Sequence, residues 1–391
     1  MERHDRPAGR GARSNRSGRF ERNTVSEVDD GWGRAQPADE RAPGGGADPD
    51  KSGRTRADPA PRGPRTTVTA EHPRTILTRN DSPDVPFEVS INPYKGCEHG
   101  CIYCFARPTH AYLGLSPGLD FETRIFSKPD AAALLTRELA RPGYRPRAIA
   151  LGANTDPYQP AERRLEITRS VLEVLRDHDH PLGIVTKSSL VLRDLDILGP
   201  MAERGLAHVY LSITTLDREL ARRMEPRAST PAERLEALGG LAAAGVPCGV
   251  LASPMIPALN DHEAERILEQ AAAAGATSAG YILLRLPLEL KELFEEWLEA
   301  NYPLKAAHVL SMVRDSRGGE LYRSHFGERM CGTGAYADLI AHRFDAACAR
   351  LGLARRSRPF DTSRFRVPRQ PTPQLDLFGL DDPAERRTRT E

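Results

Sequence analysis

Six short apolar runs, each followed by a longer amphipathic stretch, limit the possible folds of this chain more than any other feature. Because the runs are almost continuously apolar, they predict strands buried on both faces, as in a parallel sheet. The alternation therefore predicts an α/β fold with helices outside the sheet, either a partial (β/α)6 barrel or an open doubly wound sheet. The predicted strands are Phe87–Asn92, Arg147–Ala153, Leu182–Lys187, His208–Ile213, Pro247–Ser253 and Ala279–Arg285.

Helices are expected between these strands. Thr230 followed by Glu233 has the spacing of a capping box and marks the start of one helix. Another helix is predicted from Pro160 to about His178, where leucines recur on one face. Two further helices are predicted in residues 288–315. A last loop and helix in residues 323–351 would close the open edge of the sheet.

Composition divides the chain into four regions. Residues 1–65 are rich in Gly, Pro, Arg, Asp and Ser with few aliphatic side chains, which predicts disorder. Residues 84–286 hold the strand and helix series, and residues 287–352 are predicted to form the helical closing segment. Residues 353–391 are polar and proline-rich, which predicts a mostly disordered tail. Within this tail the apolar stretch Leu375–Leu380 is a candidate contact with the body of the protein or with a partner.

Composition also limits the classes of function. The chain has no run of 18 apolar residues and an arginine-rich start without the apolar stretch of a signal peptide, so a cytoplasmic protein with no membrane segment is expected. With 55 basic and 54 acidic residues, overall charge makes no case for nucleic acid. Six cysteines in 391 residues are too few for a disulfide scaffold, so reduced, metal-bound or catalytic thiols are expected.

Three of these cysteines, Cys97, Cys101 and Cys104, lie within eight residues, in the loop after the first predicted strand. Thiolates at this spacing can converge on one inorganic centre, and Gly96 and Gly100 suit a tight backbone path around it. Three protein ligands on an iron–sulfur cubane would leave one iron free for an exogenous ligand, as open metal positions do in catalytic sites. The spacing favours such a cluster.

Other interpretations of the three cysteines remain open at this point. A structural zinc site could use His99 or a remote cysteine as fourth ligand, although zinc motifs usually consist of two separated ligand pairs. Plain reduced thiols are a second alternative. A cluster with an electron-transfer or sensing role, without enzymatic activity, is a third.

Polar residues follow the predicted strands where parallel strands place an active site, at their carboxyl ends. They are Asn154 and Asp156 after the second strand, Lys187 at the third, Ser212 at the fourth and Asn260 after the fifth. A buried ammonium such as that of Lys187 needs a carboxylate partner, unless the side chain simply reaches solvent. Ser212 could equally be a hydrogen-bonded core hydroxyl, and the stretch after the second strand could be an Asx turn.

The sequence "CEHGCIYC", with Tyr103 before the last cysteine and at the head of a six-fold β/α series, resembles the radical S-adenosylmethionine (radical SAM) superfamily over about Asp84–Leu286. Within that superfamily the chain is similar to the branch related to spore photoproduct lyase. The segments that carry this similarity are "VTKSSLVLRDLDIL", "VYLSITTLD", "MEPRASTPAERLEAL" and "AGVPCGVLASPMIPALND".

The resemblance implies a partial, TIM-like (β/α)6 barrel and an enzyme of lyase or oxidoreductase type. It implies a [4Fe-4S] cluster on Cys97, Cys101 and Cys104 that binds S-adenosylmethionine and yields a 5′-deoxyadenosyl radical for hydrogen abstraction. It also implies an external one-electron reductant of the flavodoxin or ferredoxin kind. The branch includes DNA repair, which makes nucleic acid a candidate substrate.

The resemblance also assigns residues around S-adenosylmethionine. Tyr103 would lie near the adenine, Lys187 would pair with the methionine carboxylate, and Ser212 would hydrogen-bond the ribose. Asn154 and Asp156 stand where the superfamily binds the methionine amino group, although "GANTD" differs from the usual Gly-Gly-Glu.

Spore photoproduct lyase returns a hydrogen atom to its product from a cysteine after the second strand, where this sequence has Ala153. This difference argues against the same repair reaction. Cys331, in a glycine-flanked loop, is the candidate hydrogen donor here, whereas Cys248 and Cys348 are expected to be packing residues.

A set of arginines suits a polyanionic substrate such as nucleic acid, unless they form surface salt bridges with the interspersed acids. They lie in Arg222–Arg227 and at Arg314, Arg317, Arg323 and Arg329.

Overall fold

The computed structural model describes residues 9–21, 64–356 and 359–368. At its centre is a seven-stranded sheet in the order β10-β9-β8-β7-β6-β3-β2. Neighbouring strands are parallel, except for the antiparallel pair β2 and β3. The strands are β2 (Leu77–Arg79), β3 (Val89–Ile91), β6 (Ile149–Leu151), β7 (Leu182–Thr186), β8 (Ala207–Ser212), β9 (Cys248–Met255) and β10 (Ser278–Leu283).

The six predicted strands are confirmed as β3, β6, β7, β8, β9 and β10, and the α/β fold with a partial barrel is confirmed with them. The sheet is not closed, since β10 and β2 stand at its two ends. The C-terminal region runs along the free edge of β10, where Leu283 N donates to Met330 O at 2.9 Å and Ala279 N donates to Ala354 O at 2.9 Å. These bonds satisfy backbone groups that an open edge leaves unpaired.

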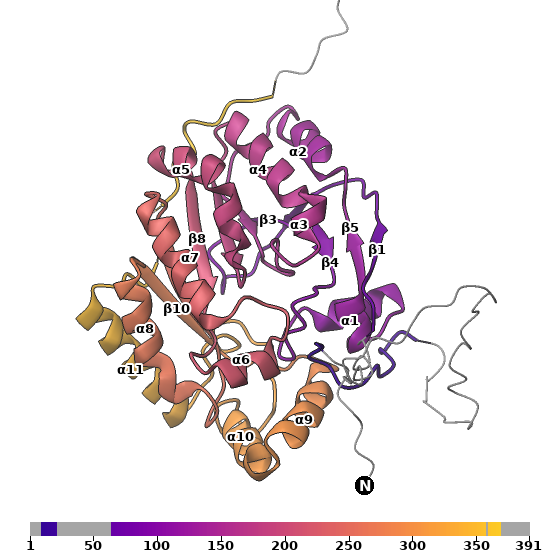
Figure 1. The fold of residues 1–391 in the computed structure, drawn as a ribbon, viewed down its shortest axis with the longest axis vertical. Coiled ribbons are helices and arrows are strands. Elements are labelled where there is room, and N and C mark those ends of the chain that lie inside the picture. Colours follow the sequence, from indigo (N-terminus) through magenta and orange to yellow (C-terminus); the bar gives the residue numbers. More distant parts are fainter. Residues whose placement is uncertain (1–8, 22–63, 357–358, 369–391) are drawn as a thin grey trace, which may run out of the picture.

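Helices cover the outside of the sheet, and α8 and α11 lie side by side over its β9 and β10 end (Figure 1). The α-helices that follow the cysteine loop are α1 (Leu119–Thr123), α2 (Ala131–Leu139), α3 (Glu162–Leu165), α4 (Ile167–Asp177), α5 (Leu195–Glu203), α6 (Arg218–Met224), α7 (Pro231–Ala243), α8 (Ala264–Ala273), α9 (Leu290–Asn301), α10 (Pro303–Asp315) and α11 (Ala335–Leu351). Short 3-10 helices are η1 (Arg107–Leu113), η2 (Ser189–Asp194) and η3 (Asp261–Glu263).

Two helix predictions can be compared with the structure. The capping box of Thr230 and Glu233 is confirmed at the start of α7. The single helix predicted over residues 160–178 is wrong in detail, because Glu166 adopts a left-handed conformation with φ of 51° and separates α3 from α4. In α4 the apolar residues at helical spacing face the sheet and are buried, as amphipathic helices require.

A second, three-stranded sheet holds the loop that carries the cysteines. It consists of β1 (Thr67–Ala70), β5 (Arg124–Ser127) and β4 (Tyr94–Lys95), in the order β1-β5-β4. The loop begins directly after β4 and ends in η1, so this sheet supports it from one side.

The predicted N-terminal disorder is wrong for residues 9–21, where Arg10 and Ala12 are only 4% and 0% exposed. Composition predicted disorder there because the segment has few aliphatic side chains, but its main chain binds buried groups of the body instead. In the predicted C-terminal tail, Phe365 contacts the rings of Tyr144 and His180. Residues 22–63 and Leu375–Leu380 lie outside the described residues. Among the described helices, none is long and apolar enough to cross a membrane.

Candidate active site

The cysteine loop, Gly96–Ala106, lies near the carboxyl ends of the strands of the main sheet. Cys97 N donates to Phe121 O at 2.9 Å, and Ile102 N donates to Met224 O at 3.0 Å. These bonds tie the loop to α1 on one side and to α6 on the other. Cys97 and Cys101 are buried, Cys104 is half-buried, and all three are free thiols.

The three thiols influence one another electrostatically. Burial raises the pKa of Cys97, Cys101 and Cys104. The negative charges of Asp156 and of the other two cysteines raise the pKa of Cys97 further, while the positive charge of Lys187 opposes the rise at Cys101 and Cys104. Buried sulfurs of this kind become thiolates when a metal supplies the compensating charge. The donor set therefore fits an iron–sulfur cluster.

A single metal ion is the alternative to a cluster at these sulfurs. Within the ranges that the structure describes, no three side chains of His, Cys, Asp or Glu have the arrangement that one metal ion requires. A tetrahedral zinc site with Zn–S bonds of about 2.3 Å brings its sulfurs to within about 3.8 Å of one another. Cysteines that hold a cubane bind different iron atoms and need no such approach.

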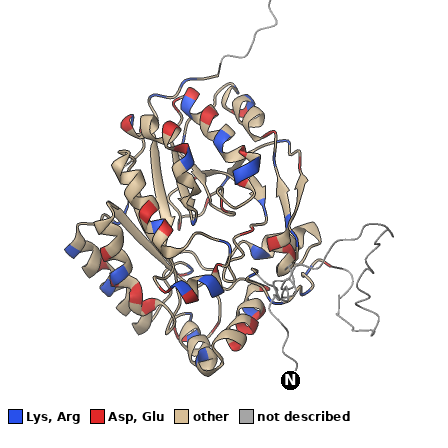
Figure 2. Ribbon diagram, in the orientation of Figure 1, with Lys and Arg blue, Asp and Glu red and all other residues tan. Residues whose placement is uncertain are grey.

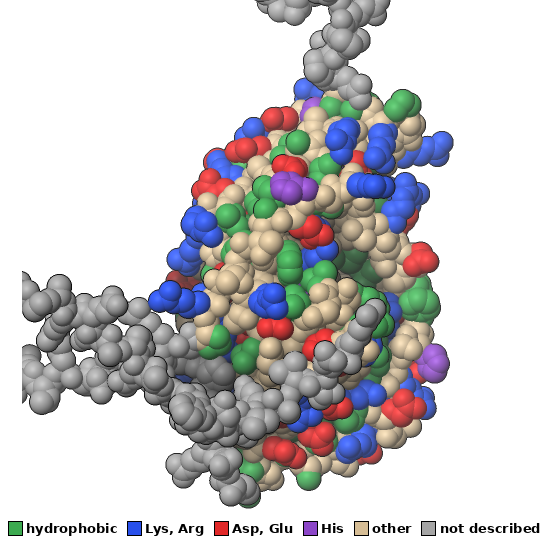
Figure 3. Space-filling view, turned by 90° about the vertical axis from the view of Figure 1, so that its right-hand side faces the viewer, with side chains coloured by type: hydrophobic (Ala, Val, Ile, Leu, Met, Phe, Trp, Pro, Cys, Tyr) green, Lys and Arg blue, Asp and Glu red, His purple; other side chains and the backbone are tan. Residues whose placement is uncertain are grey.

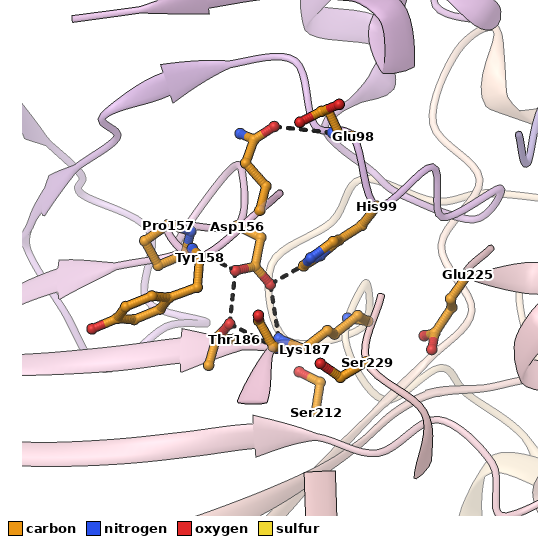
Figure 4. A network of polar contacts seen from close by, with 12 residues as sticks. Glu98, His99, Asp156, Pro157, Tyr158, Thr186, Lys187, Ser212, Glu225 and Ser229 are labelled. Atoms are coloured by element: carbon orange, nitrogen blue, oxygen red, sulfur yellow. Dashed lines mark hydrogen bonds and ion pairs between the residues drawn. The ribbon is translucent and has the colours of Figure 1, made fainter. Parts of the chain in front are cut away.

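Asp156 is the centre of a polar network at the ends of β6 and β7 (Figure 4). Its Oδ1 accepts from Tyr158 N at 2.9 Å and from Thr186 Oγ1 at 2.7 Å. Its Oδ2 accepts from Lys187 N at 2.7 Å and lies 3.3 Å from His99 Nδ1. Burial by itself would raise the pKa of Asp156, but His99, Thr186 and Lys187 N lower it to about 2. Asp156 therefore joins the cysteine loop to β7 as a carboxylate.

Lys187 and Tyr103 lie on facing sides of the site, with Lys187 Nζ 5.7 Å from the centre of the Tyr103 ring. Among the described residues no carboxylate lies within salt-bridge distance of Lys187 Nζ. Ser212, 3% exposed, ends β8 nearby, and Figure 4 shows its side chain below that of Lys187. Its hydroxyl makes no hydrogen bond to another described side chain.

Beneath Tyr103 lies a buried ion pair that the sequence did not reveal. Glu225 is 3% exposed and pairs with Arg234, which is 1% exposed. Tyr103 Oη and Thr214 Oγ1 also donate to Glu225, the latter at 2.6 Å. Arg234 donates in addition to Ser212 O at 2.9 Å. The network holds the aromatic ring and the end of β8 in fixed relation.

The comparisons with known proteins agree with this geometry. A family model described as the radical SAM superfamily matches residues 91–271. An uncharacterized protein of Mycobacterium tuberculosis is 38% identical over 293 residues, which cover 74% of this chain and 82% of that protein. This chain belongs to the radical SAM superfamily.

More distant relatives and solved structures extend the likeness. An uncharacterized protein of Methanocaldococcus jannaschii is 29% identical over 213 residues, which cover 54% of this chain and 76% of that protein. The structure of spore photoproduct lyase with a dinucleoside spore photoproduct matches with a TM-score of 0.53 and 19% sequence identity. The match covers 73% of this chain and 81% of the lyase chain. A variant of the lyase, solved with AdoMet and the dinucleoside, also has a TM-score of 0.53, with 18% identity over 73% of this chain and 81% of its own. These structures show the shared fold.

Radical SAM proteins use S-adenosylmethionine and an iron–sulfur cluster. Of the residues that the resemblance assigned, the structure brings Tyr103, Asp156 and Lys187 together around the cysteine loop. Asn154 stands next to this group, where its main-chain N donates to Asn92 Oδ1 at 3.1 Å. Its side chain makes no hydrogen bond to any residue that the structure describes.

Cys331 is in a different loop of this radical SAM fold from the three cysteines of the cysteine loop. It is exposed, and its Sγ donates to Gly327 O at 3.0 Å in the loop beside the end of β10. Its role as hydrogen donor stays a prediction. Cys248 and Cys348 are buried, as packing residues are.

Most of the arginines that suited a polyanion have partners within the protein. Arg227 pairs with Glu98 at 3.0 Å, and Arg329 pairs with Asp84. Arg317 is 1% exposed and binds backbone carbonyls. Charged residues lie mainly on the outer helices (Figure 2), and basic and acidic side chains are interspersed over the face in Figure 3, with several basic ones together toward its upper right. The polyanion argument therefore cannot rest on this set.

Proposed function

We propose that this chain is a radical SAM enzyme that holds a [4Fe-4S] cluster on Cys97, Cys101 and Cys104. These residues would hold the cluster, which when bound would offer an iron position to S-adenosylmethionine and supply the electron for its cleavage to methionine and a 5′-deoxyadenosyl radical. The observation that carries the proposal is the set of three free cysteines in one loop at the strand ends, Cys97 and Cys101 buried and Cys104 half-buried. Superfamily membership supports it.

Lys187 is proposed to pair with the methionine carboxylate. Its ammonium has no carboxylate within salt-bridge distance among the described residues, and it lies over the Tyr103 ring beside the cysteine loop. A cation in such a site gains most from an ionised ligand, because charge-assisted hydrogen bonds are about twice as strong as neutral ones. Tyr103 is proposed to contact the adenine and Ser212 the ribose.

Asn154 and Asp156 are proposed to act differently from each other. The Asp156 oxygens already accept three hydrogen bonds and lie 3.3 Å from His99 Nδ1, so this residue is suited to fixing the loop and the start of the segment after β7. Asn154 keeps an uncommitted side-chain carbonyl among the described residues, and this oxygen is the better candidate acceptor for the methionine amino group.

Nucleic acid is the substrate class that Phe105 and Arg285, which we call the mouth of the site, support best. Phe105, next to Cys104, is 44% exposed, and the Arg285 guanidinium lies 5.0 Å from the centre of its ring. Arg285 Nε is buried and has no hydrogen-bond partner in the described structure. An exposed aromatic ring can stack on a base, and an arginine can bind phosphate. A dinucleoside bound in spore photoproduct lyase, a protein of this fold, also supports the class.

The proposal predicts that anaerobically reconstituted, reduced protein forms 5′-deoxyadenosine from S-adenosylmethionine, as measured by mass spectrometry. In this assay a chemical reductant supplies the electron, whereas in the cell an external one-electron reductant such as a flavodoxin would supply it. The Cys101→Ala variant should lose the cluster and this product together, whereas Cys248→Ala, which removes a thiol from the core, should keep both. A cluster that forms but gives no 5′-deoxyadenosine would indicate an electron-transfer or sensing protein.

The substrate is then sought by adding nucleic-acid fractions whose hydrogens are replaced by deuterium. Deuterium carried into 5′-deoxyadenosine identifies the fraction from which hydrogen is abstracted. If DNA and RNA fractions transfer none while another fraction does, the nucleic-acid assignment is wrong.

A further inference from the structure

Residues 9–21 form a segment that packs against the cysteine loop, although its sequence is polar and rich in arginine. We call it the N-terminal segment. In Figure 1 it runs, in indigo, between α1 and α9. Leu119 N, at the start of α1, donates to Ser14 O at 3.3 Å, and Ser14 Oγ donates to Glu296 of α9 at 2.7 Å. The segment therefore joins two elements that are far apart in the sequence.

Glu122 links the N-terminal segment to the cysteine loop. This carboxylate is 0% exposed and accepts from Gly11 N at 2.9 Å and from Ala12 N at 2.8 Å. It also pairs with Arg107, which is 0% exposed. Arg107 donates to the carbonyl oxygen of Cys101 at 2.8 Å. One buried carboxylate thus connects the N-terminal main chain to a predicted cluster ligand through a single arginine.

Close packing adds to these hydrogen bonds. A Cβ atom at Gly11 would lie 1.8 Å from Gly100 O, so no side chain fits between the segment and the loop. Gly100 itself has φ of +67°, a conformation that L side chains rarely adopt. Ala12 is 0% exposed and belongs to the same apolar cluster as Cys101 and Ile102. The main chains of the segment and the loop are in direct contact.

The far end of the segment makes ion pairs with acidic residues at and near the start of α9. Arg16 pairs with Glu292 at 2.9 Å, and Arg19 pairs with Glu289 at 2.8 Å, both on the acidic surface near α9 seen in Figure 2. The Arg16 and Glu292 side chains are 53% and 66% exposed, and exposed ion pairs contribute at most about 1 kcal/mol. The Arg19 and Glu289 side chains are 26% and 19% exposed, so the fully buried contacts are found instead at Glu122, which accepts from Gly11 N and Ala12 N.

We propose that the N-terminal segment is a positioning element of the cluster site. Through Glu122 and Arg107 it fixes the main chain at Gly100 and Cys101, and thereby the sulfur of Cys101. The inference rests on the proposed cluster. A cubane with three protein sulfurs depends on each of them, and loss of the groups that orient a metal ligand typically costs about 10- to 100-fold in metal affinity.

Three variants test this role. The first lacks residues 1–21, the second is Gly11→Val, and the third is Arg16→Ala, a matched control in the same segment away from the loop. Each is reconstituted anaerobically with iron and sulfide. We would measure how fast an iron chelator removes the cluster absorbance and record the electron paramagnetic resonance spectrum of the reduced cluster. The melting temperature of the metal-free protein is the third measurement.

The truncated and Gly11→Val proteins should lose iron about 10- to 100-fold faster than the unaltered chain, with an altered spectrum and with similar melting of the metal-free protein. Arg16→Ala should match the unaltered chain. Equal iron retention and spectra in the truncated protein would overturn the inference, as would a fall in metal-free melting temperature that accounts for the iron loss. Failure of the unaltered chain to take up iron would instead refute the proposed function. If Gly11→Val does not fold, the truncated protein decides.

Discussion

Removing the Glu225 carboxylate should destabilise the protein strongly, because this group neutralises Arg234 in the interior. Arg234 is 1% exposed and keeps backbone carbonyl partners, but it loses its one carboxylate in the described structure when Glu225 becomes alanine. Tyr103 and Thr214 keep a hydrogen bond to each other at 3.1 Å, so their loss is small. Leaving a buried charge without its partner costs about 3–5 kcal/mol.

Urea unfolding of the metal-free protein measures this cost. Glu219→Ala is the matched control, because Glu219 pairs with Arg223 at the surface, is 59% exposed, and should cost no more than about 1 kcal/mol. The double variant Glu225→Gln, Arg234→Met leaves no buried charge. Its loss of stability should therefore be smaller than the sum of the losses in the single variants Glu225→Gln and Arg234→Met. If Glu225→Ala lowers the free energy of unfolding no more than Glu219→Ala does, the buried network does not stabilise the site as described.

Three further predictions follow from single contacts. Replacing Lys187 by methionine should weaken S-adenosylmethionine binding about 10- to 150-fold, because a charge-assisted hydrogen bond is lost, while the iron content stays the same. Unchanged affinity in equilibrium dialysis would contradict the proposed pairing of Lys187 with the methionine carboxylate. Burial lowers the pKa of His180 from 6.5 to about 4. As pH falls, the unfolded chain therefore takes up a proton on this side chain before the folded protein does. The stability that the neutral ring contributes is complete above about pH 6.5 and is lost as pH falls toward 4. The free energy of unfolding should therefore fall between pH 7 and pH 5 by about 2 kcal/mol more in the unaltered protein than in His180→Gln, and equal falls would refute this. Phe105→Ala and Arg285→Lys should each weaken nucleic-acid binding in fluorescence anisotropy without changing 5′-deoxyadenosine formation in the absence of substrate, and unchanged binding in both would argue against this mouth as the nucleic-acid site.

The main sheet could be predicted from the sequence because its strands are buried on both faces, and continuous apolar runs leave few alternatives. The break between α3 and α4 could not, since Glu166 is an ordinary helix-forming residue whose left-handed conformation is imposed by its surroundings. Propensity is a local quantity, whereas at this break the buried Glu162 carboxylate accepts from Thr168 N at 3.0 Å, a contact that the sequence does not show.

The three cysteines of the candidate site stand out in the sequence by their spacing, whereas residues that only burial marks could not be found from it. Glu225 and Arg234 look like ordinary surface charges in the sequence, because charged residues are rarely buried and nothing local marks the exception. The order in residues 9–21 was missed for a related reason. Its anchors are backbone N–H groups that bind Glu122, and the sequence shows neither the groups nor the burial of that carboxylate.

The central claim is that one iron of the cluster has no sulfur from the polypeptide and is open to S-adenosylmethionine. Mössbauer spectroscopy of ⁵⁷Fe-reconstituted protein, recorded before and after S-adenosylmethionine is added, tests it most directly. The account predicts about four irons and four sulfides per chain, with the signal of one iron changing on addition. A cluster whose irons are all unaffected by S-adenosylmethionine, or a chain that takes up one zinc and no iron, would contradict it.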